Sequence, residues 1–266
     1  MLIKLLGIDD NPLAIFLVLT TGGLLTYFLV SGLNYLIFFV WLRKRVHPSY
    51  VADPVENRKA RFWGSMSILG NAVLTMPFHF ALAHGYGKIY WDVDDYGWGW
   101  LIASLFIYLA VTETMIYWIH RLLHTDFFYN WLHKRHHQFR LTTSWVSTAF
   151  HPFDSFAQAF PHHLCVFLFP VHALLYLSMV GLVTVWAVLI HDRVSFVRWK
   201  LINYTGHHTL HHWYYRYNLG QFTTVWDRIG GTYKDPELHY PDLPEGVVVR
   251  WQDTSNKPAL APATES

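Results

Sequence analysis

The stretch YGWGWLIASLFIYLAVTETMIYWIHRLLH, residues 96–124, decides how this chain folds. Its apolar part is long enough to cross the hydrocarbon core of a bilayer as a helix, because one crossing needs about 20 residues. The stretch ends in His120 and His124, which lie about one helical turn apart and therefore on one face of the helix. It predicts a membrane-spanning helix that carries two potential metal ligands at one end.

The composition of the whole chain also favours a membrane protein. Of the 266 residues, 53% are hydrophobic and only 14% are charged, whereas soluble domains carry about 25% charged residues. The net charge of +2 provides no strongly basic face, so we expect no nucleic-acid partner. The single Cys165 excludes an internal disulfide and a cysteine-based metal cluster.

Three other apolar runs accompany the opening stretch. The runs at residues 11–42 and 62–87 contain no Asp, Glu, Lys or Arg, and each is long enough for one crossing. The first exceeds the bilayer core, so it must tilt or break at Gly22 and Gly23. The run at residues 155–190 is too long for one straight helix and slightly short for two crossings. We therefore expect a hairpin of two short helices there.

Lys and Arg near the ends of the spans predict the orientation, because they remain on the cytoplasmic side. The loop between the first two runs carries six of them, at residues 43–45 and 58–61. The loop at residues 88–95 carries one Lys and three Asp. The third crossing should therefore end on the cytosolic side, at His120.

Histidine is unusually frequent, with 18 residues in the chain. The clusters HRLLH, HKRHH and HTLHH contain His120, His124, His133, His136, His137, His208, His211 and His212. Histidines three or four positions apart share one face of a helix and can ligate one ion. Eight ligands are too many for one ion, since zinc takes about four and non-haem iron about six. The clusters therefore predict two metal ions, and imidazole alone does not distinguish Fe, Zn and Cu.

We therefore predict an all-α integral membrane protein. It should contain about three transmembrane helices, a helical hairpin and a cytosolic-side domain in which histidines ligate two metal ions.

These motifs resemble the fatty acid hydroxylase and sterol desaturase superfamily, with the closest likeness to its lathosterol oxidase, or sterol C5-desaturase, branch. The likeness is carried by IYWIHRLLH (116–124), LHKRHH (132–137), STAFHPFDSF (147–156), IHD (190–192) and GHHTLHHWYYRYNLGQFTTVWDRIGGTYKDP (206–236). It implies an oxygen-dependent enzyme with two iron ions that introduces a C5–C6 double bond into a Δ7-sterol. Its electrons would come from NAD(P)H through a separate carrier, such as cytochrome b5 or a ferredoxin.

The resemblance also divides the chain and places it in the cell. Residues 1–104 would form an N-terminal transmembrane region, residues 105–240 the catalytic region with its hairpin, and residues 241–266 a polar C-terminal tail. The membrane would be the endoplasmic reticulum in a eukaryote and the cytoplasmic membrane in a bacterium.

Five further residues are candidates for the site. His151 and His191 would raise the ligand count to ten, although His151 is equally suited to a backbone hydrogen bond at a helix start. Glu113, an acidic residue inside an apolar run, is expected to hydrogen-bond a ligand imidazole unless it is a protonated or interfacial carboxyl. Asp192 would orient a histidine unless it is a solvated cap. His207 is expected beside the ligands, because only His208 has the three-residue spacing to His211.

Two other functions stay open from the residues alone. A related membrane di-iron enzyme would hydroxylate or oxidise another lipid, such as a C4-methyl sterol, a fatty acid or a carotenoid. A histidine-rich membrane protein would instead carry metal, but a transporter places its ligands near the bilayer midplane. Here the clusters lie past the ends of the spans, which disfavours transport.

Overall fold

Long helices dominate the structure, a computed structural model that describes residues 7–8, 11–239, 242–243, 247 and 249–250. They are α2 (Pro12–Tyr35), α4 (Pro54–Ala83), α5 (Gly97–Leu123), α8 (Pro152–Leu168) and α9 (Ala173–His191). The π-helical segment η1 (Leu36–Trp41) continues α2. Most of the predicted polar tail lies outside the described residues.

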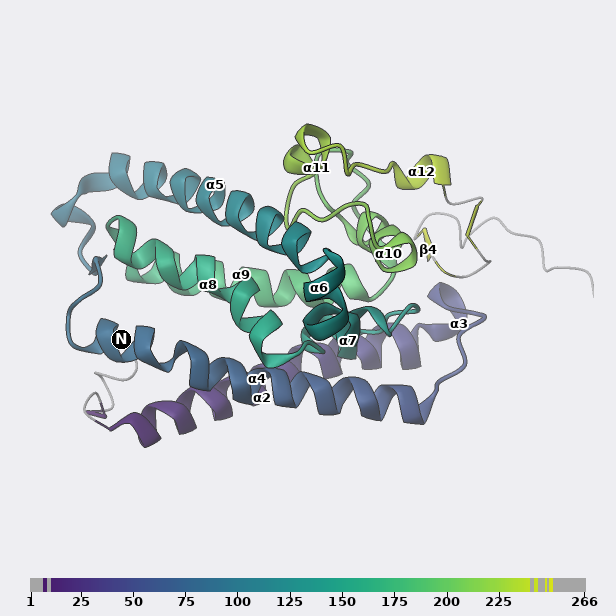
Figure 1. The fold of residues 1–266 in the computed structure, drawn as a ribbon, viewed down its shortest axis with the longest axis horizontal. Helices are drawn as coiled ribbons and strands as arrows, with labels where there is room; N and C mark the ends of the chain where they lie inside the picture. The colour runs from purple at the N-terminus through teal and green to yellow at the C-terminus, as the bar shows by residue number, and fades with distance from the viewer. Residues whose placement is uncertain (1–6, 9–10, 240–241, 244–246, 248, 251–266) are drawn as a thin grey trace, which may run out of the picture.

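Short elements occupy the connections between the long helices. The helical ones are α3 (Arg43–Val46), η2 (Val93–Asp95), α6 (Asp126–Phe128), η3 (Tyr129–His133), α7 (Lys134–His137), η4 (Ser144–Thr148), α10 (Thr205–Tyr214), α11 (Val225–Ile229) and α12 (Pro236–His239). The strands are β1 (Ile89–Tyr90), β2 (Val171–His172), β3 (Val194–Ser195) and β4 (Val249–Arg250). In Figure 1, α6, α7 and α10 to α12 gather at one end of the long helices, which we call the site end. The loop between α4 and α5 lies at the opposite, far end.

Local capping signals set where several long helices begin. The side chain of Asn11 accepts a hydrogen bond from the N–H of Ala14, and Asp53 caps α4 in the same way. Helices α2, α4 and α8 each have proline in the first turn, where its missing N–H costs nothing and its fixed φ suits a helix. The sequence thus specifies these starts without tertiary contacts.

Four helical segments are long and apolar enough to cross a membrane. They are Pro12–Trp41, Pro54–Ala83, Gly97–Leu123 and Ala173–His191. Large apolar side chains point outward from them; Leu25 on α2 is 68% exposed and Phe106 on α5 is 64% exposed. Such a surface suits lipid, while the helical backbone satisfies its own hydrogen bonds. The chain is a multi-pass membrane protein.

The last apolar run forms the predicted hairpin, from α8 and α9. Strand β1 pairs in parallel with β2, which matches Ile89 with Val171. This pairing holds the turn of the hairpin at the far end, so the chain returns to the site end at His191. The hairpin turns after Leu168, next to Pro170.

Helix α2, the first predicted span, continues through Gly22 and Gly23 without a break. Of the two alternatives for the first span, an unbroken helix is therefore the one observed.

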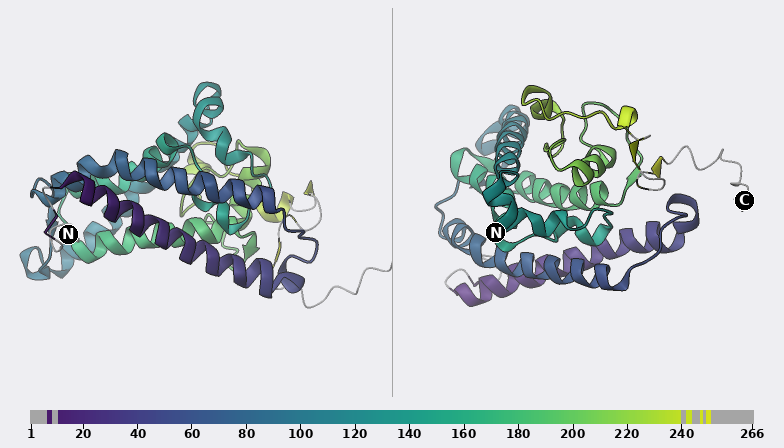
Figure 2. Two further views of the ribbon diagram at one scale, coloured as in Figure 1. Left: turned by 90° about the horizontal axis from the view of Figure 1, so that it is seen from below. Right: turned by 45° about the vertical axis from the view of Figure 1, so that its right-hand side comes forward.

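Helix α8 packs between α4 and α5, and α2 runs along α4, as both views of Figure 2 illustrate. Gly70 makes the approach of α4 to α8 possible. A Cβ atom built at this position would collide with the ring of Pro152 in the first turn of α8. Because that ring is joined to the backbone, it cannot rotate away. The contact therefore fixes the start of α8 against α4.

We expect Gly70→Ala to destabilise the protein by about 1–3 kcal/mol, the usual cost of overpacking. Gly22→Ala is the matched control, because nothing lies within 4 Å of a Cβ at that position and alanine is the better helix former. Thermal unfolding in detergent measures both changes. Equal stability of the two variants would contradict the packing described for α4 and α8.

Candidate metal centre

Two groups of histidines converge at the site end. The five-histidine group contains His120, His124, His133, His137 and His211, and the four-histidine group contains His136, His191, His208 and His212. Within each group, one ring nitrogen of every residue lies within 4.8 Å of those of the others. All eight cluster histidines and His191 are thus brought together, and metal binding by them stays a prediction.

The spacing of the clusters distributes ligands between both groups. In HKRHH, the first and last rings face the five-histidine group, while His136 faces the other. In HTLHH on α10, the assignment is reversed, since only His211 joins the five-histidine group. Positions i and i+4 lie on one helix face, and position i+3 is offset around the axis. Each of these two clusters therefore contributes to both groups, whereas both histidines of HRLLH belong to the five-histidine group.

In each ring, the hydrogen bond on the side away from the other histidines decides which nitrogen carries the proton and which has a free lone pair. Nδ1 of His120 donates to the carbonyl of Leu219 at 2.8 Å, and Nδ1 of His133 donates to the carboxylate of Asp154 at 2.8 Å. Since both partners are acceptors, each neutral ring carries its proton on Nδ1. The two Nε2 atoms lie 3.1 Å apart, so their lone pairs face each other. A cation bound between these rings would accept both lone pairs.

The four-histidine group has the same chemistry. Nδ1 of His191 donates to the carbonyl of Ala187 at 2.6 Å, which leaves its Nε2 unprotonated. That atom lies 3.0 Å from Nε2 of His208 and 3.3 Å from Nε2 of His136. His212 likewise donates from Nδ1, to the carbonyl of Phe139, and its Nε2 is buried without a partner in the described part of the chain. Both groups therefore fit a bound metal ion, with neutral imidazoles oriented by acceptors behind them.

Burial keeps the rings in the form that ligates metal. It holds the pKa of His136, His137, His208, His211 and His212 well below the ordinary value, and the neighbouring rings lower it further. Only neutral imidazole offers a lone pair to a metal. At pH 7 these five side chains are therefore ready to bind a cation.

The predictions from sequence missed Asp154 as a supporting residue. Its side chain is fully buried in the first turn of α8, and it accepts hydrogen bonds from His133 and from Gln158. A carboxylate behind a ligand histidine fixes its orientation and raises its basicity. The signal in the sequence was an acidic residue immediately before the last apolar run.

Two candidates occupy different places from those expected of site residues. His151 lies in neither histidine group; its Nδ1 caps α8 by accepting from the N–H of Phe153, the alternative that the sequence left open. Among the described residues, Glu113 forms no hydrogen bond with an imidazole. Its carboxylate accepts from the N–H groups of Phe222 and Thr223 and from the hydroxyl of Thr223. Three donors on a loop satisfy this buried carboxylate, so no imidazole is needed.

Asp192 and His207 also have structural partners. The carboxylate of Asp192 accepts from the side chain of Asn34 and from the N–H of Val194, rather than from a histidine of either group. Both ring nitrogens of His207 are buried without a hydrogen-bond partner among the described residues, and the ring packs against Tyr204. It lies in neither group, as expected, but it contacts aromatic rings rather than ligands.

Two buried carboxylates hold the loop that supports His120. Asp227 accepts from the N–H groups of Leu219 and Gly220, at 2.7 and 2.9 Å. Glu113 fixes the same loop a few residues later, as described above. The loop is thereby held with the carbonyl of Leu219 directed at Nδ1 of His120. Glu113 thus supports a predicted ligand histidine through the backbone instead of by direct contact.

A cavity of about 190 Å³ borders both histidine groups, and its lining includes His120, His191 and His208. A groove of about 530 Å³ between α2, α4, α8 and α9 adjoins it. The two spaces share six lining residues, namely Thr148, Ser155, Ala159, His162, Val183 and Thr184. The groove reaches exposed Gly22 and Gly181 on the membrane-facing surface. A lipid can therefore approach the histidines from within the bilayer.

Replacing His191 and His151 separately tests the composition of the site. We expect His191→Ala to lower the bound metal from about two ions per chain to about one, because about four ligands hold each ion. His151→Ala should leave the metal content unchanged, since that ring is part of a helix cap. Elemental analysis of purified protein measures both. Loss of metal from the His151 variant alone would contradict the assignment.

Asp154→Asn should weaken metal binding about 10- to 100-fold, the usual effect of removing a carboxylate behind a ligand histidine. Asp126→Asn is the control, because Asp126 is exposed in the first turn of α6. Competition with a chelator gives the relative affinities. Equal metal retention by the two variants would show that Asp154 does not support the site.

Comparison with known proteins agrees with this geometry. The fatty acid hydroxylase family model matches residues 105–232. A Δ7-sterol 5(6)-desaturase of Aspergillus fumigatus is 38% identical over 226 residues, which are 84% of this chain and 63% of that protein. Human lathosterol oxidase is 36% identical over 231 residues, which are 85% of this chain and 76% of that protein. A Δ7-sterol 5(6)-desaturase of Candida albicans is 36% identical, and the match spans 60% of its length.

No solved structure matches the chain. The sequence relatives alone nevertheless cover most of it, and the family-model match includes all three histidine clusters. The chain belongs to the fatty acid hydroxylase family, and within it the chain is similar to the sterol 5(6)-desaturases and lathosterol oxidases.

Proposed function

We propose that this protein is an oxygen-dependent sterol C5-desaturase that introduces a C5–C6 double bond into a Δ7-sterol. The observation that carries the proposal is the pair of histidine groups at the inner end of a cavity open to the membrane. Similarity to sterol 5(6)-desaturases supports the choice of substrate. The chain spans less than two thirds of those fungal relatives, so the activity is inferred for the part they share.

Two iron ions are the proposed cofactor, one in each histidine group. Imidazole ligands suit iron, and the two groups offer one ring nitrogen from each of five and four histidines. When bound, the irons supply the oxidising power, with O2 as co-substrate, that protein side chains lack for an unactivated C–H bond. Removal of two hydrogens as O2 is reduced to two waters requires two further electrons and two protons. NAD(P)H would supply these electrons through a separate carrier protein.

The residues of the chain provide orientation and exclusion of water. Asp154 and the carbonyl of Leu219 hold ligand rings in fixed positions, so little reorganisation is needed during the reaction. Apolar and hydroxyl-bearing side chains from α8 and α9 line the cavity and would hold the sterol rings against the histidines. The burial of the ligands keeps bulk water away from the reacting carbon atoms.

We further propose that the site end faces the cytosol. The six Lys and Arg residues of α3 and of the first two turns of α4 lie at this end, as the positive-inside preference requires. In a eukaryotic source the membrane would be that of the endoplasmic reticulum. Electron carriers and NAD(P)H would then reach the site from the cytosolic side.

Product analysis in a host that lacks its own sterol C5-desaturase tests the proposal. Expression of this chain should convert accumulated Δ7-sterol into the Δ5,7-diene, whereas the His208→Ala variant should yield none because a predicted iron ligand is lost. Chromatography with mass spectrometry identifies the sterols. A hydroxylated lipid without any diene would overturn desaturation and identify the chain as a membrane hydroxylase instead.

A further inference from the structure

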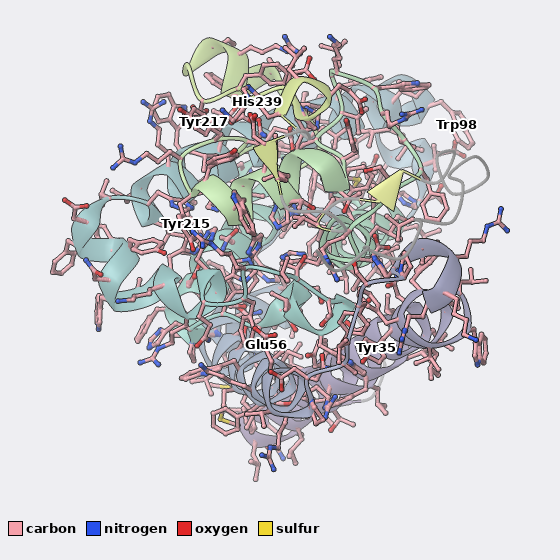
Figure 3. The ribbon with its side chains drawn as sticks, turned by 90° about the vertical axis from the view of Figure 1, so that its right-hand side faces the viewer. Tyr35, Glu56, Trp98, Tyr215, Tyr217 and His239 are labelled. Carbon is pink, nitrogen blue, oxygen red and sulfur yellow. The ribbon has the colours of Figure 1, made fainter. Side chains whose placement is uncertain are left out.

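We propose that the surface around Tyr215, at the site end, docks a small acidic protein that carries single electrons. This inference rests on the proposed function, because only a redox enzyme needs such a partner. Figure 3 faces the site end and places Tyr215 between α10 and the segment that contains α6 and α7. Three features of this surface support the assignment: a thin cover over the histidines, a strained tyrosine and a rim of unpaired positive charge.

Only a layer of aromatic side chains separates the five-histidine group from the surface here. The ring of Tyr215 lies 5.0 Å from that of His137, measured between centroids. The ring of Tyr129 lies 5.7 Å from that of His124 and 6.1 Å from that of Tyr215. Both tyrosines are half-buried, and His124 is the one histidine of the two groups that is not fully buried. Since electron transfer slows steeply with distance, this is a favourable point for electrons to reach the site.

Tyr215 adopts a backbone conformation that favours glycine. Its φ is 66°, in the left-handed region, where it ends α10. This conformation is unfavourable for a residue with a Cβ atom, and such strain is concentrated at functional positions. Here it coincides with a tyrosine ring that covers a ligand histidine.

Four positive residues belong to the segments that carry or contact the two tyrosines, and we call them the basic rim: Lys134, Arg140, Arg216 and Lys234. Lys134 is exposed at the start of α7, directly after the segment η3 that begins with Tyr129, and Arg216 is exposed next to Tyr215 in the sequence. The guanidinium of Arg140 lies over the ring of Trp213 at 4.8 Å and near that of Tyr215 at 5.9 Å. Lys234 lies over the rings of Tyr214 and Tyr217, at 4.8 and 4.9 Å. Within residues 11–239, no member of the rim forms an ion pair.

These aromatic contacts hold the charges of Arg140 and Lys234 in place without neutralising them. Stacking on a ring positions a cation, whereas a salt bridge would also cancel its field. The basic rim is therefore complementary to an acidic surface, and complementary charge speeds docking and sets its orientation. A negatively charged one-electron carrier is the partner that both the charge and the short route to His137 favour.

Charge reversal on the rim tests the proposal. The variant combines Lys134→Glu, Arg140→Glu and Arg216→Glu, and the matched control combines Arg43→Glu and Lys44→Glu, which are exposed on α3 at another corner of the site end. The probe is the soluble haem domain of cytochrome b5, an acidic carrier, kept reduced by NADH and its reductase. Sterol oxidation is followed in membranes as the carrier concentration is varied.

We expect the rim variant to raise the half-saturating carrier concentration more than tenfold. Each of the three reversed charges replaces an attraction to the acidic carrier by a repulsion and should raise that concentration several-fold. The rate at saturating carrier should change less than twofold. Added salt should slow the unmodified protein and have little effect on the rim variant, because screening acts on the attraction that was removed. The α3 control should behave like the unmodified protein.

A second reaction separates docking from chemistry. With dithionite as reductant and no carrier, all three proteins should form the same amount of product and hold the same metal. Equal carrier dependence of the rim variant and the control would overturn the docking surface while leaving the proposed function intact. Absence of sterol product from the unmodified protein under both conditions would overturn the proposed function and the docking proposal with it.

Discussion

Unprotonated imidazole nitrogens held about 3 Å apart are the arrangement on which the rest of this structure depends. Lone pairs that face each other repel, so the rings stay in place only because carbonyl and carboxylate acceptors fix them from behind. Each acceptor comes from a different element: Leu219 from a loop, Asp154 from α8, Ala187 from α9 and Phe139 from the segment after α7. The architecture of the site end follows from the need to bring these four groups behind the rings.

The membrane imposes the second constraint, because the proposed lipid substrate cannot reach a site surrounded by water on every side. Helices α5 and α9 meet this constraint by carrying His120 and His191 in their last turns, so these predicted ligands lie at the ends of the spans. The adjoining cavity and groove then lie within the helices rather than above them. Substrate access and ligand placement are thus two consequences of the same helix ends.

The sequence predicted the features of the fold and of the site that depend on the spacing of residues along the chain. Histidines three and four apart on helical segments, and apolar runs of sufficient length, predicted the convergence of the clusters and the hairpin. It did not distinguish His191 from His151, because both flank the same apolar run and only tertiary packing separates a ring in a ligand group from a ring that caps a helix. For Glu113 the unusual burial was recognised but the partner was not, since a loop about 110 residues away provides it.

Gly70 affects how accurately the carboxylate of Asp154 is positioned behind His133. The contact of Gly70 with Pro152 fixes the first residue of α8, and Asp154 follows two residues later on the same rigid helix. Sliding α8 by one turn would move that carboxylate by about 5.4 Å, far outside the reach of a hydrogen bond to His133. The contact between α4 and α8 therefore fixes the position of α8 along its axis, and with it the position of the carboxylate that orients the ring of His133, a predicted metal ligand.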